Sequence, residues 1–203
     1  ENHDVEVTTT TISDAQYNYA KALIRSRGLE HRINLLQQDY REVAGTFDRL
    51  VSVEMIEAVG HEHLPSYFQA IHRLLKGDGQ ASIQAITMPL HKYKAYLGNT
   101  DFIRRYVFPG SCCPSLAAIL NAVAENSKLR LVAQDDFAED YAITLAKWLE
   151  NFCKKEEEVR ALGFDDRFIR FWKYYLSYCE AGFRERSIGL SQLAFAAPEN
   201  RSC

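Results

Sequence analysis

The sequence has 203 residues, 47% of them hydrophobic, and a formal net charge of −3 at neutral pH. That is enough apolar material for a sizeable core, so we expect one domain over residues 1–203. The slightly negative charge gives no electrostatic case for nucleic acid, and no apolar run approaches the length of a membrane span. The five cysteines are odd in number and lack CxxC spacing, which fits free thiols in a reducing cytoplasm.

The first half of the chain alternates strand and helix patterns. Residues 5–11 are β-branched and typical of a strand, and Ser13 then caps a helix that Gly28 ends. Three further strands are expected at 32–36, 47–53 and 80–86, with a helix at 64–75 and a turn at 76–79. This alternation predicts an α/β fold with a parallel, doubly wound sheet.

The second half is mainly helical. We expect helices at 100–106, 114–126, 141–161 and 166–184, and strands at 129–133 and 188–196. The fold class is therefore α/β, a Rossmann-like sheet with a helical insertion before the last strands. Segments 88–127 and 138–186 are expected to cover a substrate. The aromatic stripe of the last helix reads mainly as a core-facing stripe, and it also suits one wall of a channel for a lipid chain.

Two carboxylates follow the predicted strand at 47–53. Ligands of open α/β sheets bind beyond the carboxyl ends of the strands, and Glu54 and Glu57 stand there. Glu57 has apolar neighbours in sequence, and an apolar pocket raises the pKa of an acid. Glu near a helix start is equally explained by the positive end of the helix dipole. These residues alone leave both interpretations open.

The sequence His61-Glu62-His63 is not expected to bind a metal. Residues two apart on a helix point in different directions, whereas helical zinc motifs place histidines four apart. We interpret it as a polar turn.

Several motifs, in order, resemble one family of lipid-modifying enzymes. They are VTTTTISDAQ, LLQQDYRE, FDRLVSVEMIEAVG, KGDG, DFIRRYVFPGSCCPS, DYAITLAKW, LGFDDRFIRFWKYYLSYCEAGF and GLSQLAFA. The chain resembles the cyclopropane-fatty-acyl-phospholipid synthases and the mycolic acid cyclopropane synthases. These are methyltransferases that use S-adenosylmethionine, and the resemblance spans nearly the whole chain.

The same resemblance indicates a missing part. The family has a glycine-rich strand-turn-helix whose backbone amides cradle the methionine part of the cofactor. This sequence does not begin with Met, and before Gly60 only Gly28 and Gly45 occur, neither in such a loop. We expect the chain to lack the family's first strand and glycine-rich loop, which would weaken cofactor binding.

The remaining cofactor positions are implied residue by residue. Thr11, Ile12 and Gln16 match the family's T-[IL]-S-x-x-Q, which contacts the cofactor after the second strand. Hydroxyls and an amide can hydrogen-bond a ribose diol. Asp39 and Tyr40 match the adenine contacts, where a carboxylate accepts from the exocyclic amine and a ring stacks. Without the resemblance, Asp39 reads as an ordinary turn residue.

The resemblance also implies the catalytic residues. An alkene attacks the sulfonium methyl group, and the resulting carbocation loses a proton before the ring closes. In the family the base is a bound bicarbonate. Glu57 and Tyr141 match the residues that hold it, Ile86 matches one that contributes its backbone, and Gln84 stands where the best-known bacterial members have His. The Glu54 side chain is interpreted as a solvated carboxylate at a helix start.

We therefore expect a cyclopropane synthase with S-adenosylmethionine and bicarbonate as cofactors. Its partners would be unsaturated phospholipid acyl chains, reached by peripheral contact with a membrane from the cytoplasm, and a homodimer is possible. Three alternatives remain open. They are a methyltransferase that makes methyl-branched lipids, one that methylates a small amine, and an inactive truncated synthase.

Overall fold

The structure, a computed structural model, describes residues 3–201. The chain divides into two compact units, one up to Thr46 and one from Phe47 onwards. Each unit is described by itself.

The first unit is a small strand-helix-strand motif. Strand β1 (Val7–Thr10) leads into helix α1 (Asp14–Ser26), and strand β2 (Ile33–Leu36) pairs with β1 in parallel. Ser13 caps α1 as predicted, because its hydroxyl accepts a hydrogen bond from the Gln16 amide. Gly28 has a φ of 63°, the left-handed conformation that commonly ends a helix.

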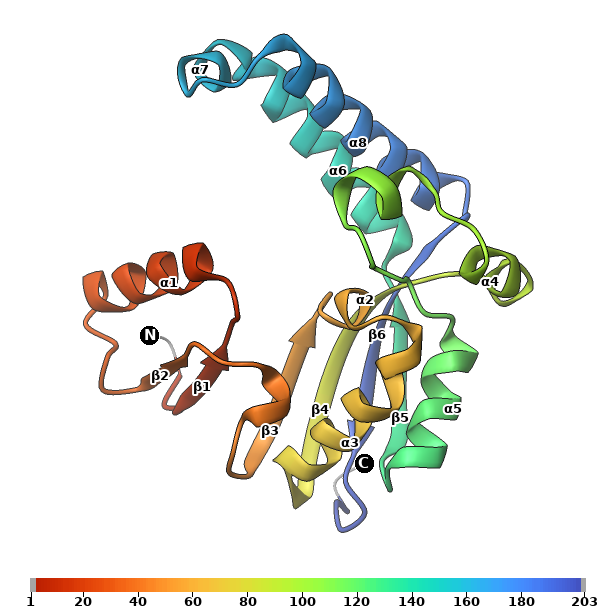
Figure 1. The fold of residues 1–203 in the computed structure, drawn as a ribbon. Helices are drawn as coiled ribbons and strands as arrows, with labels where there is room; N and C mark the ends of the chain where they lie inside the picture. Colours follow the sequence, from red (N-terminus) through yellow and green to blue (C-terminus); the bar gives the residue numbers. More distant parts are fainter. Residues whose placement is uncertain (1–2, 202–203) are drawn as a thin grey trace. The chain divides into compact units, whose positions relative to one another are not determined.

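The second unit holds a four-stranded sheet in the order β3-β4-β6-β5 (Figure 1). Its strands are β3 (Phe47–Val53), β4 (Leu75–Thr87), β5 (Arg130–Asp136) and β6 (Gly189–Ala196). Its α-helices are α2 (Ile56–Val59), α3 (Leu64–Leu74), α4 (Leu90–Leu97), α5 (Leu116–Asn126), α6 (Ala138–Lys154), α7 (Glu156–Ala161) and α8 (Asp166–Arg184). A 3₁₀ turn spans His61–His63 and a π-helical turn spans Ile103–Val107.

The sheet is mixed, so the prediction of an all-parallel sheet is wrong for β6. Strands β3 and β4 are parallel, but β6 runs antiparallel to both of its neighbours, β4 and β5. The reason lies in the connection between β5 and β6. Helices α6 and α8 pack as an antiparallel pair, so the chain travels out and back and re-enters the sheet at the end where β5 left it (Figure 1). A single crossover helix, like α3, instead returns a parallel strand.

The predicted turn at residues 76–79 is a bulge inside β4. Phe47 pairs with Leu75 and Arg49 already pairs with Gln80, so the residues between are extra on β4. A Cβ on Gly79 would come within 3.2 Å of the Asp48 carbonyl oxygen, which explains the glycine. The turn residues therefore mark a break in the strand ladder and no reversal of the chain.

The core lies between the sheet and helices α3 and α5, which pack against each other. Tyr67 and Phe68 on α3 are fully buried, and the Phe68 ring meets Phe195 of β6 edge-on at 6.0 Å. Each such buried side chain contributes about 2–3 kcal/mol through the hydrophobic effect. The Tyr67 hydroxyl donates to Ser52 of β3 at 2.8 Å, so its one polar group is also satisfied. These contacts join α3 to strands β3 and β6 of the sheet.

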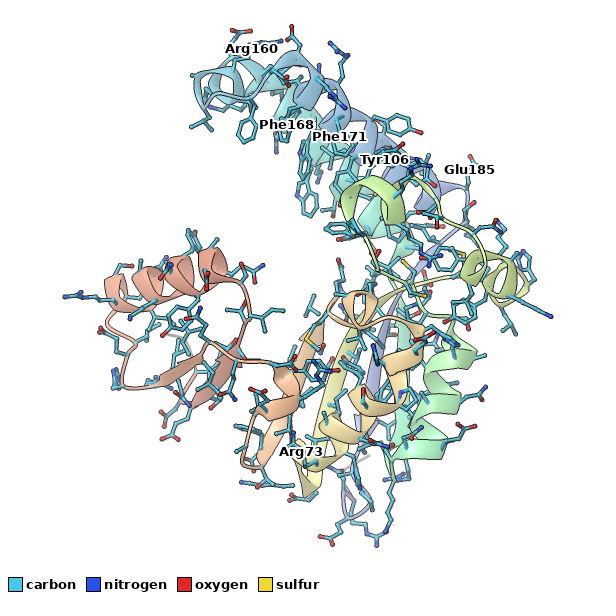
Figure 2. The ribbon with its side chains drawn as sticks, viewed as in Figure 1. Arg73, Tyr106, Arg160, Phe168, Phe171 and Glu185 are labelled. Atoms are coloured by element: carbon cyan, nitrogen blue, oxygen red, sulfur yellow. The ribbon has the colours of Figure 1, made fainter. Side chains whose placement is uncertain are left out.

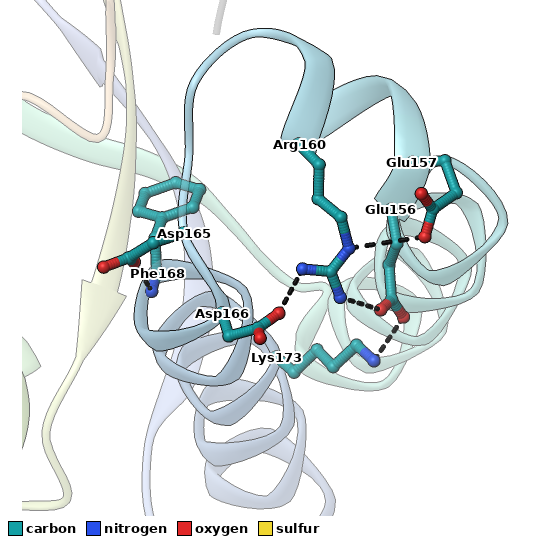
Figure 3. A network of polar contacts seen from close by, with 7 residues as sticks. All are labelled: Glu156, Glu157, Arg160, Asp165, Asp166, Phe168 and Lys173. Atoms are coloured by element: carbon teal, nitrogen blue, oxygen red, sulfur yellow. Dashed lines mark hydrogen bonds and ion pairs between the residues drawn. The ribbon is translucent and has the colours of Figure 1, made fainter.

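An ion-pair network holds the tip of the α6–α8 hairpin (Figure 3). Arg160 of α7 contacts Glu156, Glu157 and Asp166, and Lys173 of α8 also contacts Glu156. These side chains are partly exposed, so each single pair adds little to stability. Together they join α7 to α8 across the turn.

Helix α8 carries two rows of aromatic side chains. One row starts at Phe164, just before the helix, and continues with Phe168, Trp172 and Tyr175, with successive ring centroids 4.2, 5.8 and 5.0 Å apart. The other row, Phe171, Tyr174 and Tyr178, surrounds Phe102 at 4.7–5.6 Å. Figure 2 shows Phe168 and Phe171 on α8, with Tyr106 of the π-helical turn beside it. The second row thus fastens the π-helical turn to α8. In the first row, Trp172 and Tyr175 pack against the buried cluster between α6 and α8.

Candidate functional site

The candidate site lies where β3 ends, beside β4 and the base of α6. Glu54 follows the last residue of β3, and Glu57 lies in the short helix α2. Gln84 and Ile86 are on β4, and Tyr141 is in the first turns of α6. The four residues predicted to be catalytic, Glu57, Gln84, Ile86 and Tyr141, therefore all belong to the second unit.

Glu54 is the centre of a hydrogen-bond network that the sequence did not predict. Its Oε1 accepts from the Gln84 amide nitrogen at 2.7 Å, and its Oε2 accepts from the Tyr141 hydroxyl at 2.9 Å. Gln192 of β6 donates in turn to the Gln84 Oε1 at 2.8 Å, which orients the Gln84 amide. We call Glu54, Gln84 and Tyr141 the Glu54 triad. The interpretation of Glu54 as a solvated carboxylate is wrong.

The backbone at Glu54 is unusual. Its φ is 52°, in the left-handed region of backbone conformation that residues other than glycine seldom adopt. The Glu54 amide donates to the Gln84 carbonyl at 2.9 Å, so the main chain stays bound to β4 through this turn. Strained backbone of this kind occurs preferentially at functional sites. Here it turns the Glu54 carboxylate towards α6.

Glu57 is buried, as its apolar neighbours predict. Only 9% of the residue is exposed, and this burial, followed by the nearby charge of Glu54, raises its pKa to about 7. Its Oε1 accepts from the Ile86 amide at 2.5 Å, while its Oε2 is buried with no hydrogen-bond partner among the described residues. The Ile86 amide, predicted to contact an anion, thus binds Glu57. Burial therefore favours the neutral form of Glu57 relative to an exposed glutamate.

Tyr141 acts as a hydrogen-bond donor. Burial, reinforced by the Glu54 charge, raises the pKa of its hydroxyl well above the usual range. Its ring packs edge-on against Phe183 of α8 at 5.0 Å. The sequence predicts a Tyr141 hydroxyl that shares an anion with Glu57, but the structure places the hydroxyl on Glu54.

Tyr175 extends the site along α8. Its hydroxyl pKa is raised to about 12, first by burial and then by Cys179 and the Glu54 charge. Tyr175 also ends the first aromatic row, which begins at Phe164. The row thus leads along α8 towards the Glu54 triad. The helical spacing of these aromatic residues was the one sequence signal for it.

The residues predicted to bind the cofactor lie in the first unit. The Thr11 hydroxyl donates to the Gln16 side-chain oxygen at 2.8 Å, just beyond β1, and Ile12 is 76% exposed. Tyr40 begins a 3₁₀ turn that Asp39 caps, beyond the end of the neighbouring strand β2.

Asp39 also has a charged partner. The Arg41 side chain forms two hydrogen bonds with its carboxylate, at 2.9 and 2.7 Å, and lowers the pKa of Asp39 to about 2. This is the ordinary turn geometry that the residues alone suggest. Its predicted contact with adenine stays a prediction.

A cavity of about 790 Å³ lies apart from this site, on the other face of the same strands. Ser191 and Thr87 line it, and Ser191 stands directly opposite Ala85 in the ladder. Gln84 stands opposite Gln192, one residue along, so their side chains point to the opposite face. The cavity therefore does not include the Glu54 triad.

Comparison with known proteins identifies the family. The model of the mycolic acid cyclopropane synthetase family matches residues 1–193. The chain belongs to this family. Among curated relatives, the tuberculostearic acid methyltransferase UfaA1 of Mycobacterium tuberculosis is 39% identical over 92% of this chain and 44% of that protein. The cyclopropane-fatty-acyl-phospholipid synthase of Escherichia coli K12 is 36% identical over 96% of this chain and 48% of that protein.

Solved structures of the family share the fold. The cyclopropane synthase MmaA2 from M. tuberculosis aligns with a TM-score of 0.86 at 22% identity, over 96% of this chain and 71% of that one. The mycolic acid cyclopropane synthase CmaA1, complexed with SAH and CTAB, aligns with a TM-score of 0.85 at 24% identity, over 96% and 70%. This confirms the predicted α/β methyltransferase fold. The chain spans about half the length of the curated relatives that it matches.

Proposed function

We propose that the protein transfers one carbon from S-adenosylmethionine to the double bond of unsaturated phospholipid acyl chains, and so forms cyclopropane fatty acids. The observation that carries this proposal is the Glu54 triad beside the buried acid Glu57, at the strand ends of a family member. A carbocation chemistry needs a proton acceptor inside an apolar site, and this arrangement supplies carboxyl groups there.

The first unit suits the cofactor. Thr11 and Asp39 follow the ends of two adjacent parallel strands, where open α/β sheets bind ligands. Thr11 and Gln16 offer exposed hydrogen-bonding groups for a ribose, and Tyr40 offers a ring for adenine. When bound, S-adenosylmethionine supplies an electrophilic methyl group.

The first aromatic row suits an acyl chain. Phe168 and Trp172 are half-buried and stack in line towards Tyr175, so they form an apolar surface that ends at the triad. A chain lying along this surface would bring its double bond towards Glu54 and exclude water. The row therefore supports the interpretation that segment 138–186 covers a lipid substrate. It favours a lipid over the small amine of the alternative function.

Bicarbonate, the base that the family resemblance implies, does not fit the residues as they are arranged. The Glu57 Oε2 is free for a partner, but the Tyr141 hydroxyl and the Gln84 amide both donate to Glu54. The Ile86 amide donates to Glu57. No proton transfer is therefore assigned to bicarbonate.

We also propose peripheral contact with the membrane. None of the described helices is long and apolar enough to cross a bilayer. Tyr106 and Phe108 are 60% and 52% exposed, and aromatic residues favour the membrane interface. Flotation with phospholipid vesicles tests this contact, and equal flotation of wild type and a Tyr106→Ser, Phe108→Ser double variant would rule it out.

A methyl-branched product is the second candidate, because the relative UfaA1 is named a tuberculostearic acid methyltransferase. Lipid extracts of cells that express the complete protein distinguish the two. Cyclopropanation adds one methylene and removes the alkene without a reductant. A methylene-branched lipid retains an alkene until it is reduced. Unchanged lipids would refute both candidates.

A further inference from the structure

The position of the Glu54 carboxylate gives it a candidate role in the proposed reaction, and this inference rests on the proposed function. Two donors from different elements, Gln84 on β4 and Tyr141 on α6, converge on one carboxylate. The family resemblance implies that these same donors would bind a bicarbonate anion. In this chain the oxyanion that they bind is a side chain.

The bonding leaves that carboxylate able to react. A carboxylate has about four lone-pair positions, and the two donors use one on each oxygen. Glu54 is half-buried, so its carboxylate is partly shielded from water. Tyr175 lies close enough to be affected by its charge, and it brings the aromatic row to the same place.

The second carboxyl group complements the first. Glu57 is held by the Ile86 amide at one oxygen, in a buried position that favours its neutral form. Pairs of acids in unlike environments commonly divide acid and base roles. Burial thus favours the neutral form of Glu57, while Glu54 accepts hydrogen bonds at both oxygens.

We propose that the Glu54 carboxylate is the general base of the reaction and takes the place of the bound bicarbonate that the family resemblance implies. The alkene carbon forms a bond to the methyl group of the sulfonium donor, which leaves as the thioether, and the neighbouring carbon becomes cationic. One C–H bond of the transferred methyl group breaks, its electron pair closes the ring onto the cationic carbon, and the proton goes to Glu54. Tyr141 and Gln84 position this base.

The test measures cyclopropane formation by the complete protein with S-adenosylmethionine and vesicles of an unsaturated phospholipid. Reactions are run in buffer depleted of carbon dioxide and in the same buffer with added sodium bicarbonate. Wild type is compared with Glu54→Gln and Glu54→Gly. Glycine accepts the positive φ at this position and opens the space of the side chain, whereas glutamine fills it without a proton-accepting carboxylate. Glu62→Gln, an exposed acid in the neighbouring turn, is the control and should match wild type.

We expect wild type to be equally active in both buffers. Glu54→Gln should lose at least about 100-fold in turnover in both, since a missing general base costs about that much. Glu54→Gly should be equally impaired without bicarbonate and recover at least about 10-fold with it, because the open space and the freed donors admit the anion. Circular dichroism and cofactor binding confirm that each variant is folded.

Three outcomes would overturn the proposal. If wild type loses activity without bicarbonate and regains it on addition, bicarbonate is the base and the proposed function survives. If folded Glu54→Gln retains full turnover, Glu54 has no catalytic role. If the complete wild-type protein forms no product in either buffer, the proposed function itself fails, and this proposal fails with it.

Discussion

The Tyr141 hydroxyl donates a 2.9 Å hydrogen bond to the Glu54 carboxylate, across 87 positions of sequence. The bond joins the base of the α6–α8 hairpin to the end of β3. It also brings the charged group of the site to the helices that would cover a lipid chain. The site therefore depends on a contact between two elements that are distant in the sequence.

Tyr141→Phe removes only the hydroxyl of this contact. We expect turnover to fall about 10- to 100-fold while the Michaelis constant for S-adenosylmethionine stays within about twofold, because the base loses its positioning donor. Tyr174→Phe is the matched control, since Tyr174 is 54% exposed on α8. Steady-state kinetics of both variants measure the difference. Equal activity of Tyr141→Phe and wild type would remove Tyr141 from the site.

Glu57 makes stability depend on pH. Its folded pKa of about 7 lies above its ordinary value of 4.5, so the folded state binds more protons than the unfolded state between these values. The free energy of unfolding should therefore fall as the pH rises from about 4.5 to about 7, by about 3 kcal/mol in total from this group. Below pH 4.5 Glu57 is protonated in both the folded and the unfolded state, so it no longer lowers the free energy of unfolding.

Glu57→Gln isolates this effect, because glutamine stays neutral and can still accept from the Ile86 amide. Urea unfolding of both proteins at several pH values measures it. The stability of wild type relative to the variant should decline across this range. A difference that stays constant with pH would show that Glu57 titrates normally.

Variants of Asp39 and Arg41 distinguish a role of Asp39 in cofactor binding from a role in the turn. Asp39→Ala should weaken S-adenosylmethionine binding about 10-fold if the carboxylate contacts adenine, since a lost charged hydrogen bond costs about 1.5–3 kcal/mol. Arg41→Ala breaks the same ion pair and keeps the carboxylate, so it should bind nearly as wild type does. Calorimetry on the complete protein compares them. Equal losses would mean that the pair acts only through the turn.

The two aromatic rows of α8 predict different kinetics. Phe168→Ala should raise the Michaelis constant for phospholipid several-fold, because it interrupts the row that leads to the triad. Phe171→Ala is a matched control from the other row, which packs around Phe102. It should lower the melting temperature without a comparable change in that constant. The reverse pattern would place the lipid on the other row.

Much of this site follows from local sequence, and its connections do not. The end of β3 and the buried Glu57 were predictable, since an apolar strand and apolar neighbours are local patterns. The role of Glu54 was not, because it depends on a positive φ and on partners from β4 and α6. The direction of β6 was missed for a similar reason: it follows from the packing of α6 on α8, and helical periodicity alone does not report it.

In the proposed reaction a base removes a proton from the transferred methyl group. Its most direct test is a reaction of the complete protein with S-adenosylmethionine whose methyl group carries three deuterium atoms. Mass spectrometry and NMR of the lipid product then count the retained deuterium and locate it. We expect a ring methylene that retains two of the three deuterium atoms, with the alkene lost. A product that retains all three as an intact methyl group would contradict the account.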